Sequence, residues 1–297
     1  MSTLLPKLSR ELLLSDYDNF CFDADGCLWN ENDPIIGATS WINTLLEQKK
    51  RVFIVTNNST KTLPQYIKKV RTLGFGNITE ENIICPPVVL NDFLKRNPKY
   101  ASKAIYVFGS NALATSLEDG SGVKTIGPGP DPASVDAAFF DSVDVSTPVS
   151  AVVVGYDAHV SYVKIMKAAN YLRDPEVGFF IMNEDKTFPT KTGKFIVPGT
   201  GCITASVRAA ANPREPIVFG KPSRALTEYL QRHDLVPDRT IMFGDRLDTD
   251  IKWANESGFS SCLVLTGVHQ EEDVERVRAE GEDPSLIPRF TATFAEL

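Results

Sequence analysis

The chain has 297 residues, which is enough for about two domains and for a sizeable buried core. Hydrophobic residues make up 42% of it and charged residues 23%, which excludes the disordered, collagen-like and fibrous classes. The 38 acidic and 31 basic residues give a formal net charge of −7, so the surface offers no general attraction for nucleic acid or for an anionic membrane.

Short apolar runs alternate with helical patterns along the chain. The apolar runs, rich in Val, Ile and Phe, predict strands at Asn19–Phe22, Arg51–Val55, Ala104–Phe108, Ala151–Val154, Pro216–Phe219, Thr240–Phe243 and Cys262–Leu265. The segments between them predict helices at Trp41–Lys50, Leu63–Leu73, Val88–Arg96, Val160–Leu172, Ala225–His233 and Asp248–Ser257. This alternation is typical of βαβ units, so we expect an α/β protein with a Rossmann-like, doubly wound parallel sheet.

The middle of the chain breaks this rhythm. Gly and Pro crowd together from Gly127 to Pro132, within the longer stretch Gly120–Pro148. We interpret residues 90–205 as a second α/β domain that is inserted into a first domain formed by residues 1–89 and 206–297.

The cysteines and the N-terminal segment indicate the compartment. The five cysteines are scattered without a Cys-x-x-Cys spacing, which is typical of buried reduced thiols. The first residues show no apolar core followed by a cleavage site, and no apolar run reaches the ~18 residues that a membrane span needs. We therefore expect a soluble cytoplasmic protein that contacts neither membrane nor nucleic acid.

Polar residues follow four of the predicted strands, at the sheet edge where doubly wound proteins bind their ligands. The first strand leads directly into Asp23 and Asp25. Carboxylates at i and i+2 of an extended segment point to the same side, and their repulsion favours a bound cation. Mg²⁺ suits such a pair, because one or two carboxylates, substrate phosphate oxygens and water complete its ligands.

The other three strand ends offer groups for a phosphate and for a metal. The run Thr56–Thr60, which includes Asn57 and Asn58, supplies hydroxyl and amide donors ahead of a helix. Lys221 precedes another helix, and Asp245 and Asp250 follow the strand that ends at residue 243. Each motif alone has an ordinary explanation as a turn, a helix cap or a surface lysine. Their succession after predicted strands favours one shared site.

Together these residues resemble the haloacid dehalogenase superfamily of phosphatases. Its Asp-x-Asp-Gly, Ser/Thr, Lys and Gly-Asp-x-x-x-x-Asp motifs are matched by Asp23–Gly26, Thr56, Lys221 and Gly244–Asp250. Further segments, such as Gly220–Ser223, are similar to the subgroup that contains 4-nitrophenylphosphatase, phosphoglycolate phosphatase and pyridoxal phosphate phosphatase. In that subgroup an α/β cap is inserted between the Ser/Thr and Lys motifs, which agrees with the inserted segment expected here.

The resemblance implies the chemistry of the acidic residues. Asp23 would be the nucleophile that forms an aspartyl-phosphate, and Asp25 would be the general acid and then the general base. Mg²⁺ would be held by Asp23, the backbone carbonyl of Asp25 and Asp245. Asp250 would orient the metal ligands without touching the ion.

The resemblance also implies how the phosphate and the rest of the substrate are held. The phosphoryl oxygens would contact Thr56, Asn57, Asn58 and Lys221. Relatives that cleave pyridoxal phosphate use a cap histidine, and an alignment on the downstream Pro-Gly-Thr-Gly places Phe188 at that position in this chain. We therefore expect a small ester of the 2-phosphoglycolate or glycerol 3-phosphate type, with 4-nitrophenyl phosphate as an artificial substrate.

Several alternatives stay open at the level of sequence. The chain could be a pyridoxal 5′-phosphate phosphatase, a phosphoprotein phosphatase, a mutase that transfers the phosphoryl group to a sugar, or a regulatory relative without catalysis. Cys27 lies close enough to Asp23 for its oxidation to disturb the nucleophile loop, although a packed thiol is the simpler interpretation. The subgroup also suggests a homodimer formed through the cap.

Overall fold

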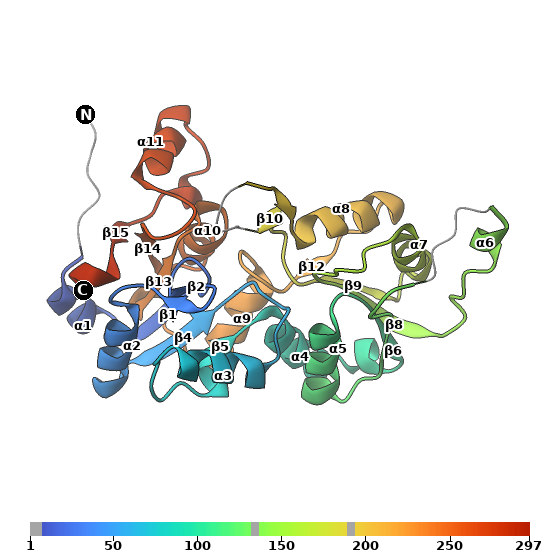
Figure 1. Ribbon diagram of the computed structural model, residues 1–297, viewed down its shortest axis with the longest axis horizontal. Coiled ribbons are helices and arrows are strands. Elements are labelled where there is room, and N and C mark those ends of the chain that lie inside the picture. Colours follow the sequence, from blue (N-terminus) through green and yellow to red (C-terminus); the bar gives the residue numbers. More distant parts are fainter. Residues whose placement is uncertain (1–7, 132–136, 189–193) are drawn as a thin grey trace. The chain divides into compact units, whose positions relative to one another are not determined.

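The computed structural model describes residues 8–131, 137–188 and 194–297 (Figure 1). The chain divides into two compact units. The first comprises the residues up to Thr56, Leu63–Ile84 and Lys221–Leu297, and the second comprises Asn57–Thr62 and Cys85–Gly220. The expectations about a leader peptide and about the Gly/Pro stretch rest partly on residues 1–7 and on Pro132, which lie outside the described residues.

A parallel six-stranded sheet forms the centre of the first unit, in the order β15-β14-β13-β1-β4-β5. Its strands are β1 (Asn19–Phe22), β4 (Arg51–Val55), β5 (Ile83–Ile84), β13 (Thr240–Gly244), β14 (Ser260–Val264) and β15 (Phe290–Ala292). Strand β1 pairs with β13 on one side and with β4 on the other. All four residues of β1 are buried, as expected for a strand that is covered on both faces.

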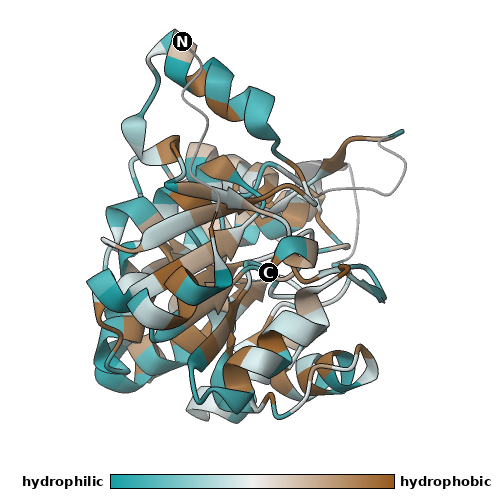
Figure 2. Cartoon of the chain, turned by 90° about the vertical axis from the view of Figure 1, so that its left-hand side faces the viewer, coloured by the Kyte–Doolittle hydropathy of each residue, from teal (hydrophilic) through white to brown (hydrophobic). Residues whose placement is uncertain are grey.

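Helices cover both faces of this sheet. They are α1 (Arg10–Asp16), α2 (Ala38–Glu47), α3 (Leu63–Thr72), α9 (Arg224–Arg232), α10 (Lys252–Glu256) and α11 (Glu271–Glu280). Figure 1 shows α2 and α3 on the opposite side of the sheet from α10 and α11, as right-handed crossovers require. The apolar strands lie between helices whose outer faces are hydrophilic (Figure 2). A short hairpin of β2 (Trp29–Asn30) and β3 (Asp33–Pro34) follows the loop after β1.

The second unit has its own parallel sheet, in the order β12-β9-β8-β6-β7. Its strands are β6 (Ala104–Phe108), β7 (Thr125–Ile126), β8 (Val149–Val154), β9 (Gly178–Ile181) and β12 (Ile217–Val218). Its helices are α4 (Pro86–Arg96), α5 (Asn111–Ser121), α6 (Ala137–Asp141), α7 (Tyr162–Tyr171) and α8 (Thr200–Ala210). Helices α4 and α5 pack together on one face and α7 and α8 on the other (Figure 1). An antiparallel hairpin joins β10 (Thr187–Phe188) to β11 (Val197–Pro198).

The predicted α/β class with parallel sheets is confirmed, and two local expectations are corrected. The run Pro216–Phe219, expected in the first domain, forms β12 and pairs with β9 in the second unit. An apolar run shows that a strand forms but not which sheet it joins, because pairing partners lie far away in sequence. The helix expected at Asp248–Ser257 begins instead as a π-helical turn, η4 (Leu247–Ile251), in which the N–H of Ile251 donates to the carbonyl of Arg246.

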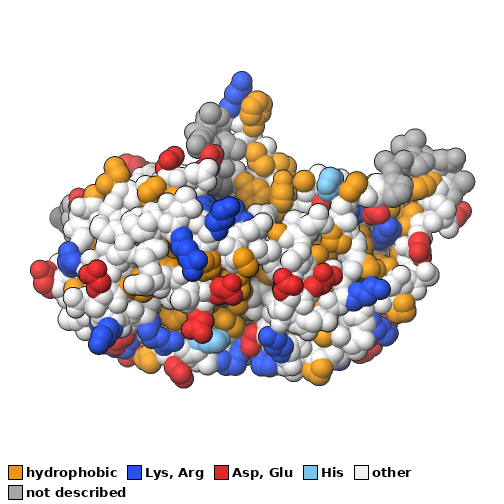
Figure 3. All heavy atoms as spheres, turned by 60° about the horizontal axis from the view of Figure 1, so that its bottom comes forward, with side chains coloured by type: hydrophobic (Ala, Val, Ile, Leu, Met, Phe, Trp, Pro, Cys, Tyr) orange, Lys and Arg blue, Asp and Glu red, His pale blue; other side chains and the backbone are white. Residues whose placement is uncertain are grey.

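Two observations bear on membranes and nucleic acid. In residues 8–131, 137–188 and 194–297, every helix is too short or too polar to cross a bilayer. Basic and acidic side chains are interspersed on the face that Figure 3 presents.

Candidate active site

Three acidic side chains of the first unit meet at the carboxyl ends of β1 and β13. Asp23 follows β1, Asp245 follows β13 directly, and Asp250 lies in η4. One carboxylate oxygen from each lies within 4.8 Å of the other two. Asp245 and Asp250 are buried, and the side chain of Asp23 is 13% exposed. The first and fourth predicted motifs therefore form one site.

Lys221 lies among these carboxylates. Its ammonium is 2.5 Å from Asp23 Oδ1 and 2.7 Å from Asp250 Oδ1, and it also donates to the carbonyl oxygen of Val55. Burial alone would lower the pKa of Lys221, but the charges of Asp23 and Asp250 raise it above its usual value. The lysine is therefore a fixed cation at neutral pH.

One ammonium does not neutralise three carboxylates. Burial raises the pKa of Asp245 to about 7, and the negative charge of Asp250 acts in the same direction. Burial also raises the pKa of Asp23 well above its usual value, against the opposing charge of Lys221. Buried carboxylates behave in this way when their negative charge exceeds the positive charge around them. The cluster therefore contains more negative than positive charge.

The oxygen atoms of this cluster fit a divalent cation. Asp245 Oδ2 accepts a hydrogen bond from the backbone N–H of Val268 at 2.8 Å, whereas its buried Oδ1 has no hydrogen-bond donor among the described residues. A buried carboxylate oxygen without a donor is destabilising unless a cation binds it. Clustered carboxylate oxygens are the ligands that Mg²⁺ prefers. The residues present therefore suit the Mg²⁺ that the sequence predicts.

Two glycines let the surrounding loops close around Asp245. Gly26 has a φ of 93°, and a Cβ there would lie 2.6 Å from Asp245 Oδ2, while a Cβ at Gly267 would collide with the same oxygen. Thr266 donates to the carbonyl oxygen of Gly26 at 2.8 Å and so ties the loop after β14 to the loop after β1. No role was predicted for Thr266 and Gly267, although they directly follow the strand predicted at Cys262–Leu265.

Asp25 lies two residues after Asp23 in sequence but is held by a different set of partners. Its Oδ1 accepts a hydrogen bond from the indole N–H of Trp29 at 2.8 Å and lies 3.5 Å from the ammonium of Lys69. Its side chain is 38% exposed, which is far more than that of Asp23. The contacts of Trp29 and Lys69 with Asp25 were not predicted, because neither residue directly follows a predicted strand.

Comparison with known proteins places the chain in a family. The model of the haloacid dehalogenase-like hydrolases matches residues 20–122, and a second, HAD-hydrolase-like model matches residues 218–290. Glycerol-3-phosphate phosphatase of Mus musculus is 38% identical over 282 residues, which cover 91% of this chain and 86% of that protein. The chain belongs to the haloacid dehalogenase-like hydrolase family. The predicted resemblance is thereby confirmed.

Two further similar proteins are longer than this hydrolase, which matches only part of each. A protein of Caenorhabditis elegans named as a NipSnap protein is 46% identical over 274 residues, and this chain spans 52% of its length. The crystal structure of glycerol phosphate phosphatase from Mycobacterium tuberculosis in complex with magnesium matches with a TM-score of 0.74 and 26% identity, over 95% of this chain and 76% of that one.

The hydroxyl and amide run after β4 passes from the first unit of the hydrolase to the second. Thr56 is buried at the end of β4 in the first unit. In the second unit the amide of Asn57 donates to Asp185 Oδ1 at 3.1 Å, and Asn58 Oδ1 accepts from the backbone N–H and the hydroxyl of Thr60 at 2.9 and 2.7 Å. The phosphate-binding roles of Thr56, Asn57 and Asn58 stay predictions.

Phe188, the expected specificity residue, lies in strand β10 of the second unit. Its ring packs edge-on against Tyr156, with ring centroids 5.3 Å apart and an angle of 80° between the planes. Tyr156 follows the central strand β8, so this aromatic pair stands at the carboxyl end of the second sheet. Pro189, the next residue of the predicted specificity segment, lies outside the described residues. The role of Phe188 in specificity stays a prediction.

Cysteine burial follows the expectation with one exception. Cys21, Cys27, Cys85 and Cys262 are buried, but Cys202 is exposed, because the first turn of α8 presents it to solvent. Burial raises the pKa of the Cys27 thiol well above its usual value, and its Sγ lies 3.5 Å from the carbonyl oxygen of Phe243. A protonated, packed thiol reacts slowly with oxidants, which favours a structural role for Cys27 over redox control.

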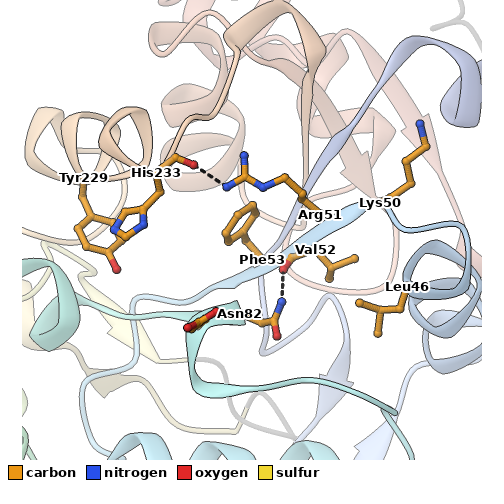
Figure 4. Close-up of a pocket in the computed structure, with 9 residues that line it drawn as sticks. Leu46, Lys50, Arg51, Val52, Phe53, Asn82, Tyr229 and His233 are labelled. Atoms are coloured by element: carbon orange, nitrogen blue, oxygen red, sulfur yellow. Dashed lines mark hydrogen bonds between the residues drawn. The ribbon is translucent and has the colours of Figure 1, made fainter.

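A pocket of about 410 Å³ lies at the other end of β4, away from Val55 (Figure 4). Its lining residues are Leu46, Lys50, Arg51, Val52, Phe53, Glu81, Asn82, Tyr229 and His233. The guanidinium of Arg51 donates to the backbone carbonyl of His233, and the amide of Asn82 donates to that of Val52. These polar groups join segments of the first unit, and none of the predicted site residues lines the pocket.

Replacing Asp245 with Asn is expected to stabilise the metal-free protein at about pH 8. Below pH 3.8 the carboxyl is protonated in both the folded and the unfolded state, and as the pH rises to about 7 the folded state loses stability, because its pKa is raised. An amide removes that buried charge, so the first unfolding transition in EDTA should rise by roughly 5 °C, as measured by scanning calorimetry.

The same variant should lose the rise in melting temperature that Mg²⁺ produces in the wild type, because ligand binding stabilises the folded state only where the ligand is held. Asp33→Asn serves as the matched control, since Asp33 is exposed in the same unit. A variant that melts below the wild type in EDTA at about pH 8 would contradict the unbalanced charge of the cluster.

Proposed function

We propose that this hydrolase is a Mg²⁺-dependent phosphatase that cleaves small phosphate monoesters through an aspartyl-phosphate on Asp23. The observation that carries the proposal is the buried set of Asp23, Lys221, Asp245 and Asp250 at the carboxyl ends of β1 and β13. A nucleophilic carboxylate that faces a dianionic phosphate needs compensating positive charge, and this set supplies a lysine and the ligands of a cation.

The reaction divides into two displacements at phosphorus. In the first, a carboxylate oxygen of Asp23 forms a bond to phosphorus while the bond from phosphorus to the ester oxygen breaks, and Asp25 gives its proton to that leaving oxygen. In the second, a water oxygen attacks the phosphorus of the aspartyl-phosphate as Asp25 takes up its proton. Inorganic phosphate leaves, and the carboxylate of Asp23 is restored.

The other residues hold the reacting groups in place. Lys221 fixes Asp23 through their ion pair, and Asp250 fixes Lys221. Asp23, Asp245 and the backbone carbonyl of Asp25 would hold Mg²⁺, whose charge, when bound, reduces the repulsion between carboxylate and phosphate. The phosphoryl oxygens would be bound by the side chains and backbone N–H groups of Thr56, Asn57, Asn58 and Lys221.

The second unit would act as the cap that selects the alcohol part of the ester. Phe188 replaces a histidine expected of pyridoxal phosphate-cleaving relatives, and it packs on Tyr156 in this unit. Relatives of this chain include proteins named glycerol-3-phosphate phosphatase. These observations support glycerol 3-phosphate or 2-phosphoglycolate as the substrate type. Pyridoxal 5′-phosphate is the second candidate, because the subgroup that the sequence resembles also contains pyridoxal phosphate phosphatase.

Steady-state kinetics on a panel of esters tests the substrate. We expect release of phosphate that EDTA abolishes and Mg²⁺ restores, with kcat/KM for glycerol 3-phosphate or 2-phosphoglycolate at least ~10-fold above that for pyridoxal 5′-phosphate. A phosphopeptide serves as the macromolecular control. A higher kcat/KM for pyridoxal 5′-phosphate would overturn the substrate assignment, and absence of release from every ester would overturn the proposed activity.

Two expectations about the setting of the enzyme remain predictions. The homodimer formed through the cap would draw on apolar side chains of the second unit that reach solvent, such as Val160 and Tyr162, which are 52% and 69% exposed. The cytoplasmic location rests on the cysteine usage, because free, mostly buried thiols are typical of a reducing compartment.

A further inference from the structure

Two side chains from different elements converge on one oxygen of Asp25. Trp29 in β2 is fully buried, and its indole N–H donates to Asp25 Oδ1 at 2.8 Å. Lys69 in α3 places its ammonium 3.5 Å from the same oxygen and 4.5 Å from the centroid of the Trp29 ring. Phe75 packs edge-on against that ring at 5.9 Å. The indole is therefore held on several sides while it binds the carboxyl group.

The local fold explains why Trp29 can reach back to Asp25. After β1 the chain turns tightly, and the N–H groups of Leu28 and Trp29 both donate to the carbonyl oxygen of Ala24. The N–H of Gly26 donates in turn to the carbonyl oxygen of Trp29 at 2.9 Å. These bonds close the loop on itself and place the indole over the Asp25 side chain. Trp29 is thus part of the loop that follows Asp23, even though its ring is buried.

We infer that Trp29 and Lys69 are positioning residues that fix the orientation in which the Asp25 carboxyl group exchanges a proton with the reacting oxygens. The inference deepens the proposed function, because it rests on Asp25 as the general acid and base. An oxygen that accepts a hydrogen bond from an N–H group and faces an ammonium presents its lone pairs to them. The two contacts therefore hold Oδ1 in place and limit rotation of the carboxyl group about its Cβ–Cγ bond.

This arrangement affects one bond-making event in each half of the reaction. In the first displacement the O–H bond of the Asp25 carboxyl group breaks and the proton forms a bond to the leaving ester oxygen, which departs as the alcohol. In the second the carboxylate takes a proton from the attacking water. If the indole N–H is absent, the carboxyl group can rotate about its Cβ–Cγ bond, and proton transfer loses its alignment.

The decrease in kcat/KM that follows from misaligned proton transfer should depend on the leaving group. Glycerol 3-phosphate releases a basic alkoxide oxygen that needs a proton as it departs, whereas 4-nitrophenyl phosphate releases a stabilised phenolate that does not. The quantity kcat/KM reports the steps up to the departure of the alcohol, so hydrolysis of the aspartyl-phosphate does not enter it. A merely structural defect would lower kcat/KM for the two esters to the same extent.

The test measures kcat/KM for these two esters in Trp29→Phe and Lys69→Met. Trp29→Phe keeps a ring for Lys69 and Phe75 but removes the N–H, and Lys69→Met removes the charge but keeps the length of the side chain. Each variant is expected to lose about 10-fold with glycerol 3-phosphate and less than ~3-fold with 4-nitrophenyl phosphate. Asp25→Asn sets the upper limit, with a loss of roughly 10²–10⁴-fold for the alkyl ester.

Matched controls come from the same unit. Trp41→Phe removes a buried indole whose N–H has no hydrogen-bond partner among the described residues, and Lys68→Met removes the exposed lysine next to Lys69. Both controls should keep the wild-type ratio of the two kcat/KM values. Equal losses for both esters in Trp29→Phe and Lys69→Met, or no loss at all, would overturn the inference while the wild type remains active. A wild type that hydrolyses neither ester would overturn the proposed function and the inference together.

Discussion

Asp23→Asn is expected to abolish Mg²⁺-dependent release of phosphate, with kcat lower by about 10⁴-fold or more. The amide oxygen is neutral and does not form the bond to phosphorus that a carboxylate forms, so the first displacement has no nucleophile. The amide has nearly the shape of the carboxylate and still accepts a hydrogen bond from Lys221, so the fold should persist. Phosphate release from 4-nitrophenyl phosphate measures the effect.

Covalent chemistry on Asp23 makes a second readout available. Mass spectrometry after acid quenching should find a phosphorylated peptide that contains Asp23 in the wild type and none in the variant. Asp33→Asn, an exposed substitution in the same unit, should keep both activity and phosphopeptide. Asp23→Asn with wild-type kcat would show that another group attacks phosphorus, and the aspartyl-phosphate would have to be abandoned.

Lys221→Met is expected to produce the largest loss of stability, about 3–5 kcal/mol in EDTA. It leaves Asp23, Asp245 and Asp250 buried together without the ammonium that contacts two of them. The loss should be greater at about pH 8 than at about pH 5, because burial raises the pKa of both Asp23 and Asp245 and both accept protons as the pH falls. Urea unfolding of the first unit, followed by tryptophan fluorescence, measures it.

A second lysine substitution serves as the control for the stability loss of Lys221→Met. Lys68→Met removes a lysine that is exposed, and it should change the unfolding free energy by less than ~0.5 kcal/mol. Activity of Lys221→Met should fall as well, because Asp23 loses its orienting partner. A stability loss that is equal at both pH values would contradict the assignment of Lys221 as counter-charge to titrating carboxylates.

Much of the fold and of the acidic cluster could be predicted because the signals are local. A strand buried on both faces is a continuous apolar run, and Asn19–Phe22 and Arg51–Val55 were predicted with the bounds that the structure has. In a parallel sheet the carboxyl ends of the strands share one edge, so acids that follow β1 and β13 meet. Asp23 and Asp245 could thus be placed together from the sequence.

The remainder could not be predicted because it depends on contacts between distant segments. Nothing in the residues of Pro216–Phe219 indicates that this strand pairs with β9 rather than with a strand of the first unit. Lys69 lies on an ordinary amphipathic helix, and only the packing of α3 brings it to Asp25. Trp29 is a large, mostly apolar residue of the kind that fills protein cores, and its contact with Asp25 is made by one nitrogen atom.

The central place of β1 also constrains how a nascent chain reaches this structure. One edge of β1 pairs with β4, which soon follows it from the ribosome, but the other edge pairs with β13, which begins at Thr240. The continuous segment Cys85–Gly220 is complete before β13 has been made, so most of the second unit can assemble while β1 still exposes an unpaired apolar edge. Chaperones that shield strand edges would therefore act on the first unit until β13 has been made, rather than on the inserted unit.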